Sequence, residues 1–216
     1  MGNRLALPPL YVILDAALLP SDPIELTKKL LDAGARVFQY RNKTAPALEL
    51  LHASQALCLT IRQQGGSFVV NDRADICRLA GANGVHIGQD DLSVASAREV
   101  VGSGGVIGLS THNLRQVEAA VETSADYIAV GPIFATASKK YPDPVVGVDF
   151  IREARKFTRT PIVAIGGITL DRVREVIDAG ADSVAVISDI LTAKNPAARV
   201  KQYLEILPAA AQPAGN

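Results

Sequence analysis

Short apolar runs alternate with helical patterns eight times along this chain of 216 residues. Strictly alternating units predict a parallel sheet, because parallel neighbours need a crossover segment between them. Several runs are apolar throughout, which is typical of strands that are covered on both faces. The predicted strands span residues 10–15, 37–41, 68–71, 84–88, 106–110, 127–131, 161–165 and 183–187, and the predicted helices span 23–33, 45–64, 74–80, 94–101, 114–122, 149–157, 170–179 and 197–207.

Eight strand-then-helix units in about 200 residues predict a single-domain (β/α)8 TIM barrel, an α/β fold, at the small end of its size range. We expect the barrel to span residues 1–207 and residues 208–216 to form a flexible tail. The competing interpretation is a doubly wound open sheet. That fold normally has a glycine-rich nucleotide-binding turn after its first strand, and Asp15-Ala-Ala-Leu18 is not such a turn.

Composition excludes several classes of protein. Lys and Arg number 22, and Asp and Glu also number 22, so the formal net charge of zero argues against a nucleic-acid partner. Cys58 and Cys77 cannot form a disulfide framework, and we expect both to be reduced thiols on apolar helix faces. No apolar run approaches the ~18 residues of a membrane helix. We therefore expect a cytoplasmic protein without a membrane partner, and whether it forms a homo-oligomer stays open.

Cations stand at the end of the second predicted strand. Because side chains alternate along a strand, Gln39 and Arg41 are expected to point toward the barrel axis, with Lys43 at the rim. Phe38 and Tyr40 then take the opposite face. An Arg fork and a Lys point charge at the mouth of a barrel predict an anion site. The alternative is that both cations begin a solvated loop.

Carboxylates follow the third and fourth predicted strands, where Asp72 and Asp91 stand. Neighbouring strands of a barrel bring their end loops together, and Mg²⁺ is commonly held by one or two carboxylates with substrate phosphates and waters. The alternative is that these carboxylates cap the helices that follow. Ser93 is a better-placed cap than Asp91, which weakens the alternative for that residue.

The last four predicted strands end in groups that suit a second anion site. The loops after strands seven and eight form the recurrent phosphate site of this barrel, with backbone N–H groups facing the anion. Two anion sites in one barrel mouth suggest a metal-bound diphosphate substrate beside a monophosphorylated one. The groups are Ser110 and Thr111, the long connection that carries Thr136, Ser138 and Lys139, Gly166 and Gly167, and Ile187 and Ser188.

Taken in order, these motifs resemble the thiamine-phosphate synthase family over residues 10–207. The resemblance implies a (β/α)8 barrel that joins 4-amino-2-methyl-5-hydroxymethylpyrimidine diphosphate to a carboxythiazole or hydroxyethylthiazole phosphate. The products are thiamine phosphate and pyrophosphate. The motifs are Gln39-Tyr-Arg-Asn-Lys43, Val70-Asn-Asp72, His86-Ile-Gly-Gln-Asp-Asp91, Gly131-Pro-Ile-Phe134 with Thr136 and Lys139, Ile165-Gly-Gly-Ile168 and Val186-Ile-Ser188.

The resemblance also implies roles for particular residues. Asp72 and Asp91 would hold one Mg²⁺ ion. The family loop commonly reads Pro-Thr-x-Thr-Lys, whereas this chain has Ala135-Thr-Ala-Ser-Lys139, which keeps the hydroxyl but loses the proline. The pyrimidine diphosphate would be held by Gln39, Tyr40, Arg41, Asn42, Lys43, Asn71, Ser110 and Lys139, of which Arg41, Lys43, Ser110 and Lys139 would be catalytic, and the thiazole phosphate would be held by Thr136, Ala137, Ser138, Gly167, Ile187 and Ser188.

Three other functions compete with this interpretation. A related thiazole tautomerase would not need the Gln-x-Arg-x-Lys motif or the paired aspartates. A non-catalytic paralogue that binds thiamine phosphate is also compatible with the fold, although it would not need intact ion-binding positions. A sugar-phosphate isomerase or epimerase would need an acid–base pair inside the barrel in place of clustered cations.

Overall fold

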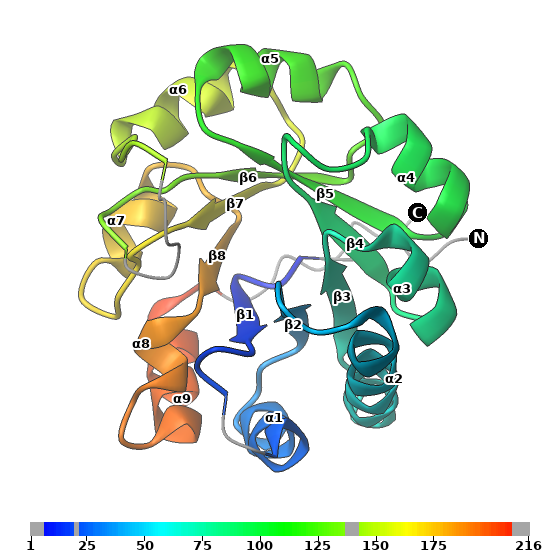
Figure 1. The fold of residues 1–216 in the computed structure, drawn as a ribbon. Coiled ribbons are helices and arrows are strands. Elements are labelled where there is room, and N and C mark those ends of the chain that lie inside the picture. Colours follow the sequence, from blue (N-terminus) through cyan, green and yellow to red (C-terminus); the bar gives the residue numbers. More distant parts are fainter. Residues whose placement is uncertain (1–6, 20–21, 137–142, 209–216) are drawn as a thin grey trace, which may run out of the picture.

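The computed structural model describes residues 7–19, 22–136 and 143–208. Within these ranges, eight parallel strands close into one barrel in sequence order, and β8 pairs with β1 (Figure 1). The predicted (β/α)8 barrel is therefore confirmed. The strands are β1 (Leu10–Asp15), β2 (Val37–Arg41), β3 (Ser67–Asn71), β4 (Gly84–Ile87), β5 (Val106–Thr111), β6 (Tyr127–Val130), β7 (Ile162–Ile165) and β8 (Ser183–Val186).

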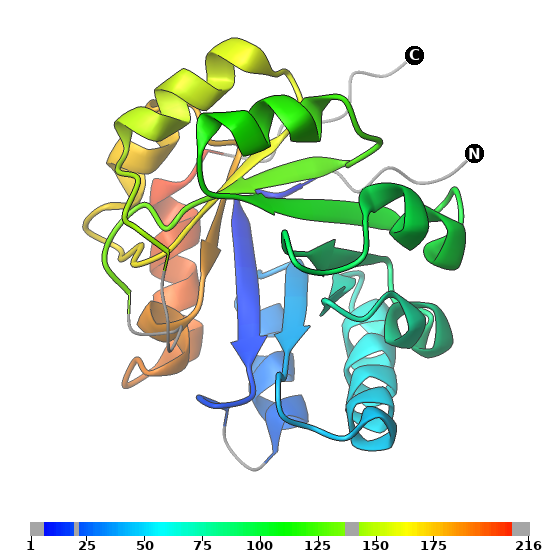
Figure 2. The ribbon, with the colours of Figure 1, turned by 45° about the horizontal axis from the view of Figure 1, so that its top comes forward.

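Helices surround the strands, as Figures 1 and 2 show from two directions. None of the helices in the described ranges is both long and apolar enough to cross a membrane. The tail expected at residues 208–216 lies outside those ranges except for Pro208. The helices are α1 (Pro23–Asp32), α2 (Ala47–Gln63), α3 (Ala74–Ala80), α4 (Val94–Val101), α5 (Leu114–Val121), α6 (Asp149–Phe157), α7 (Val173–Asp178), α8 (Ser188–Leu191) and α9 (Pro196–Ile206).

Alternation along each strand divides the core into two apolar clusters. On β1, Leu10, Val12 and Leu14 point outward into the cluster between strands and helices. Tyr11 and Ile13 point inward into a smaller cluster that fills the barrel. The interior is thus packed with side chains, as in other barrels of this size, and the inner cluster consists of Tyr11, Ile13, Val37, Val69, Val106, Tyr127, Ala129, Val163 and Ala185.

Local signals place most helix starts where the sequence predicts them. The side chains of Asp22, Ser93 and Asn113 each accept a hydrogen bond from a backbone N–H of the first turn that follows. Most bounds lie within two residues of the prediction, and two elements near the C-terminus differ more. The helix expected at 170–179 begins only at Val173, and the turn expected after β8 contains the short helix α8. A helix of four residues is too short to show the periodicity by which helices are recognised.

Candidate active site

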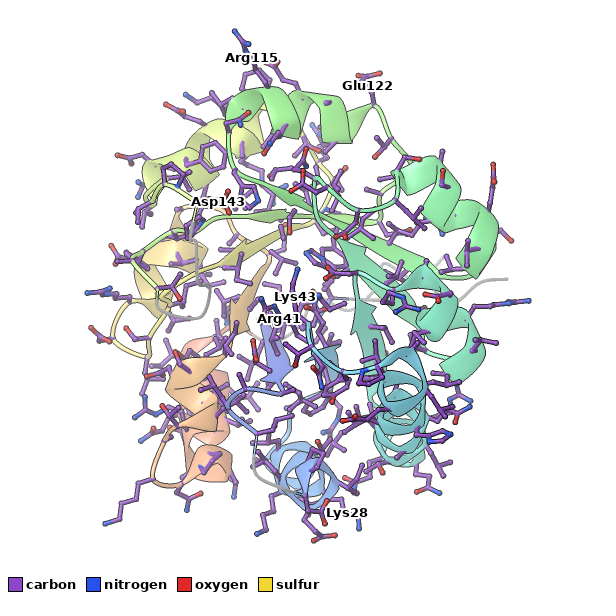
Figure 3. All side chains as sticks on the ribbon, viewed as in Figure 1. Lys28, Arg41, Lys43, Arg115, Glu122 and Asp143 are labelled. Carbon is purple, nitrogen blue, oxygen red and sulfur yellow. The ribbon has the colours of Figure 1, made fainter. Side chains whose placement is uncertain are left out.

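A cavity of about 430 Å³ lies at the carboxyl ends of the strands. Its lining includes cations, carboxylates, amides and hydroxyls, so the cavity suits a charged ligand. Figure 3 shows Arg41 and Lys43 over the middle of the barrel, whereas Lys28, Arg115 and Glu122 lie on the outer side. The polar lining residues are Tyr11, Gln39, Arg41, Lys43, Asn71, Asp72, His86, Gln89, Asp90, Asp91, Ser110, His112, Gln116, Tyr127, Thr136 and Asp143.

Strand β2 has the register that the alternation of its side chains predicts. Gln39 and Arg41 line the cavity, and Lys43 follows at its rim. Tyr40 is buried on the opposite face, in the cluster beneath the helices. Asn42 also lies outside the lining, and its Oδ1 accepts hydrogen bonds from the backbone N–H groups of Thr44 (3.1 Å) and Ala45 (3.0 Å). Asn42 therefore stabilises the turn that leads into α2.

Arg41 is held by a partner that the sequence did not reveal. Its guanidinium donates a hydrogen bond to Oδ2 of Asp15, at the end of β1, and the two groups form an ion pair. The Asp15 side chain is only 6% exposed and also accepts a hydrogen bond from the N–H of Ala17 (3.0 Å). The ion pair fixes the direction of the Arg41 side chain at the cavity wall.

The two predicted metal ligands lie next to each other. Burial and the neighbouring Asp72 carboxylate raise the pKa of Asp91, with burial the larger cause. Oδ2 of Asp91 accepts a hydrogen bond from the N–H of Gly88 (2.7 Å), and Nζ of Lys43 lies 2.9 Å from Oδ2 of Asp72. Two carboxylates that repel each other are a donor set that a hard divalent cation would stabilise.

Neither carboxylate acts as a helix cap. The residue before α3 is Arg73, and no side chain caps that helix. Ser93 caps α4. Asp72 also has a backbone φ of 63°, which is uncommon for a residue other than glycine, and its N–H donates to the carbonyl of His86 (2.7 Å). Backbone strain of this kind is concentrated at functional sites.

Ser110, at the end of β5, is positioned from two sides. Its Oγ lies 2.8 Å from Nε2 of His86, and its carbonyl accepts a hydrogen bond from Nε2 of Gln89 (2.6 Å). His86 is 8% exposed, and burial lowers its pKa to about 4. Its imidazole is therefore neutral near pH 7.

His112 and Asp143 also line the cavity, and neither was singled out from the sequence. Nδ1 of His112 lies 2.6 Å from the carbonyl oxygen of Gly131, and its Nε2 lies 3.7 Å from Oδ2 of Asp143. These contacts link the loop after β5 to the connection between β6 and α6. No local pattern marks either residue, because the contact joins segments that are about 30 residues apart in the sequence.

A second cavity of about 380 Å³ adjoins the first. Gly167 has a φ of 62°, and a Cβ atom there would lie 2.4 Å from the carbonyl oxygen of Ala135 and 2.9 Å from Cβ of Phe134. Only glycine allows this approach, so the pair of glycines predicted for this site is required by the backbone. The two cavities share Thr136, Gly166, Ala185 and Ile187 in their linings.

The second cavity contains a cation that the sequence analysis missed. Arg172 lies in its lining together with Ser188, the first residue of α8. The guanidinium carbon of Arg172 lies 4.8 Å above the ring of Phe134, a distance typical of a cation–π contact. The predicted helix at 170–179 would have placed Arg172 within a helix, but the structure places it in the turn before α7.

Comparisons with known proteins decide the family. A family model described as thiamine monophosphate synthase matches residues 10–190. The chain belongs to this family. A thiamine-phosphate synthase of Koribacter versatilis is 48% identical over 212 residues, covering 96% of this chain and 99% of the relative. Another, from Lawsonia intracellularis, is 41% identical and covers 92% of each chain. A solved structure of a thiamine phosphate pyrophosphorylase from Pyrococcus furiosus superposes with a TM-score of 0.85 at 32% identity, covering 94% of this chain and 96% of the other.

Resemblance to the thiamine monophosphate synthase family assigned residues to each substrate, and the structure brings most of the described ones together. Those that line the first cavity are Gln39, Arg41, Lys43, Asn71, Asp72, Asp91 and Ser110, and those that line the second are Thr136, Gly167, Ile187 and Ser188. Tyr40 and Asn42 line neither cavity. Ala137, Ser138 and Lys139 lie outside the described residues.

Proposed function

We propose that the chain is a transferase that joins the aminopyrimidine diphosphate to a thiazole phosphate and releases thiamine phosphate and pyrophosphate. The observation that carries the proposal is the pair of adjoining cavities at one barrel mouth. The first has cations and paired carboxylates, and the second has a glycine-rich backbone and Arg172. The printed names of the relatives support the same activity and do not favour the tautomerase or the non-catalytic paralogue.

The first cavity would take the pyrimidine diphosphate. Arg41 and Lys43 supply positive charge at the rim, and Asn71 and Ser110 add an amide and a hydroxyl. Gln39, which also lines this cavity, would bind the pyrimidine ring. The family resemblance implies that Lys139, which lies outside the described residues, would add a further cation.

Asp72 and Asp91 fit a Mg²⁺ ion, because they are adjacent carboxylates whose repulsion a divalent cation would relieve. When bound, the ion would neutralise charge that develops on the diphosphate as it leaves. Lys43, which pairs with Asp72 at 2.9 Å, would add a positive charge beside these carboxylates for the diphosphate.

The reaction needs no protein nucleophile. The bond between the pyrimidine methylene carbon and the diphosphate oxygen breaks, and the amino group of the ring donates electrons to the cation that remains. The thiazole nitrogen then forms a bond to that carbon with its lone pair, and the diphosphate departs with the electrons of the broken bond. The protein contributes charge from Arg41 and Lys43, which is commonly the largest catalytic term, and holds the two substrates in line.

The second cavity would take the thiazole phosphate. Thr136, Ser188 and backbone N–H groups near Gly167 provide hydrogen-bond donors, and Arg172 provides a positive charge. Because the cavities share four lining residues, a ring bound between them would lie within reach of both sites. Bound side by side, the two substrates would be in position for displacement.

Incubation with both substrates and Mg²⁺ tests the proposal. Product detected by mass, or as the fluorescent thiochrome after oxidation, should appear only when both substrates are present, with one pyrophosphate released per thiamine phosphate formed. A control with the thiazole phosphate alone, monitored for tautomer exchange, tests the tautomerase alternative. Binding of thiamine phosphate without turnover under any of these conditions would contradict the proposal.

A further inference from the structure

A chain of hydrogen bonds crosses the barrel interior and joins two residues of the first cavity. Nε2 of Gln39 donates to Oη of Tyr11 at 3.1 Å, and Oη of Tyr11 lies 3.1 Å from Oη of Tyr127. Oη of Tyr127 lies 3.0 Å from Nδ1 of His86, whose Nε2 lies 2.8 Å from Oγ of Ser110. Five strands contribute one residue each, so this chain of hydrogen bonds forms only when the barrel is closed.

The three residues in the middle of this chain are enclosed by the barrel. Tyr11 is 1% exposed, Tyr127 is 0% exposed and His86 is 8% exposed. The rings of His86 and Tyr127 stack with their centroids 5.5 Å apart. Gly108 on β5 leaves the space that Tyr127 fills, because a Cβ atom there would lie 2.0 Å from Cζ of the Tyr127 ring. Buried hydroxyls so placed need their hydrogen-bond partners.

The donor and the acceptor of each of these hydrogen bonds can be assigned in order, starting from Gln39. An amide nitrogen only donates, so Tyr11 accepts there and its own hydroxyl proton goes to Tyr127. The hydroxyl proton of Tyr127 then goes to Nδ1 of His86. A neutral imidazole with an acceptor at Nδ1 has its proton at Nε2, and that proton goes to Oγ of Ser110.

We propose that Tyr11, Tyr127 and His86 are positioning residues that fix the hydrogen-bonding polarity of the first cavity. With this direction, Gln39 turns its carbonyl oxygen to the ligand as an acceptor, and Ser110 turns its hydroxyl hydrogen to the ligand as a donor. The opposite direction would exchange both roles at once. We call this chain of hydrogen bonds, from Gln39 through Tyr11, Tyr127 and His86 to Ser110, the relay. The relay therefore couples two ligand contacts that come from different strands.

The expected ligand matches this polarity, and at this point the inference rests on the proposed function. An aminopyrimidine presents an amino donor beside a ring nitrogen that accepts. Its 4-oxo counterpart presents a carbonyl acceptor beside a ring N–H donor, which is the inverse pattern. The relay should make the cavity select the amino form, because a mismatched ligand leaves buried polar groups unpaired.

The histidine tautomer tests the relay without any ligand. In protein labelled with ¹⁵N at histidine, the His86 signals should show a proton on Nε2 and a bare Nδ1 near pH 7. Tyr127→Phe removes the donor to Nδ1 and should give a mixture of both tautomers. Tyr203→Phe is the matched control, because it also removes a buried hydroxyl, one that donates to Asp189 at 2.7 Å outside the relay. A proton on Nδ1 in the unsubstituted protein would overturn the proposed polarity.

Ligand selectivity tests whether the relay makes the cavity prefer the amino form of the pyrimidine. Calorimetry with the 4-amino and 4-oxo pyrimidine diphosphates should show a preference for the amino form that falls by about tenfold or more in Tyr11→Phe and Tyr127→Phe. Affinity for the thiazole phosphate should stay unchanged in both variants, and Tyr203→Phe should keep the full preference. If Tyr11→Phe and Tyr127→Phe fold and keep the preference unchanged, the proposed role of the relay is overturned and the proposed function is not. Failure of the unsubstituted protein to bind either diphosphate would overturn the proposed function and the selectivity assigned to it.

Discussion

At the scale of single residues, the ion pair between Arg41 and Asp15 should link stability to activity. Arg41→Ala leaves the carboxylate of Asp15, whose side chain is 6% exposed, without its cation. We expect a loss of about 3 kcal/mol in the free energy of unfolding, since removal of one partner strands a buried charge. The rate should fall by on the order of 100-fold, since a preorganised donor is lost.

Urea unfolding and initial rates measure these two effects of Arg41→Ala. Arg174→Ala is the matched control, because Arg174 pairs with Asp178 on the surface, where the two side chains are 71% and 57% exposed. We expect that control to change the unfolding free energy by less than about 0.5 kcal/mol. Equal losses in the two variants would mean that burial of Asp15 has no energetic consequence.

The two thiols should be unreactive in the folded protein. Cys58 and Cys77 are free and buried, as the sequence predicts. Burial raises the pKa of Cys77 to about 12 and also raises that of Cys58, so almost no thiolate forms at about pH 8. A colorimetric disulfide reagent should label neither thiol until urea unfolds the chain, and then label both. Rapid labelling of one thiol in native protein would contradict the burial.

At the scale of elements, the turn after β7 should depend on glycine. Gly167→Ala places a Cβ atom 2.4 Å from the carbonyl oxygen of Ala135 at a φ of 62°. The connection after β6 must then move, and we expect the KM for thiazole phosphate to rise at a stability cost of about 1–3 kcal/mol. Gly65→Ala is the matched control, since Gly65 has a φ of 72° but no atom within 4 Å of the added Cβ. That variant should lose some stability and keep its KM.

Arg172 belongs to the same element and should bind the phosphate of the second substrate. Arg172→Ala removes the cation from the second cavity, so the KM for thiazole phosphate should rise by about tenfold or more, the effect of losing a charge-assisted hydrogen bond. The KM for the pyrimidine diphosphate should stay unchanged. Steady-state kinetics with each substrate varied in turn measures both constants, and an equal rise in the two would contradict the assignment. Arg174→Ala, nearby on α7, should change neither.

The elements also show which parts of the site a sequence can reveal. Apolar runs predicted all eight strands, and alternation on β2 correctly separated Gln39 from Tyr40. Arg172 was missed because the helix that follows it begins later than its pattern predicts, at Val173, which leaves Arg172 in the turn before α7. Asp15 and His112 were missed because each acts through a partner on another strand or loop. Contacts of this kind become visible only when the barrel is closed.

At the scale of the whole molecule, the barrel places most of the groups that stabilise the fold away from the groups of the site, and the ion pair between Arg41 and Asp15 is an exception. Apolar clusters inside and outside the strands hold the barrel closed. The charged groups stand at the ends of the strands, where burial and, to a smaller extent, the neighbouring carboxylate of Asp72 raise the pKa of Asp91. Activity at the mouth can therefore be removed without loss of the fold, in line with the trade-off between stability and function seen in many enzymes.

That separation predicts what removal of the metal would do. In excess chelator, the activity should disappear and return on addition of Mg²⁺, while the melting temperature should fall only slightly, because the lost metal stabilised the folded protein but the apolar core is untouched. Asp91→Asn should likewise reduce turnover sharply but leave the chelated protein as stable as before, or more so, because it removes one of two repelling carboxylates beside Asp72. An amide oxygen can still accept the hydrogen bond from Gly88. Rates at several Mg²⁺ concentrations and thermal unfolding in chelator measure the two quantities, and full turnover in excess chelator would remove the metal from the proposed reaction.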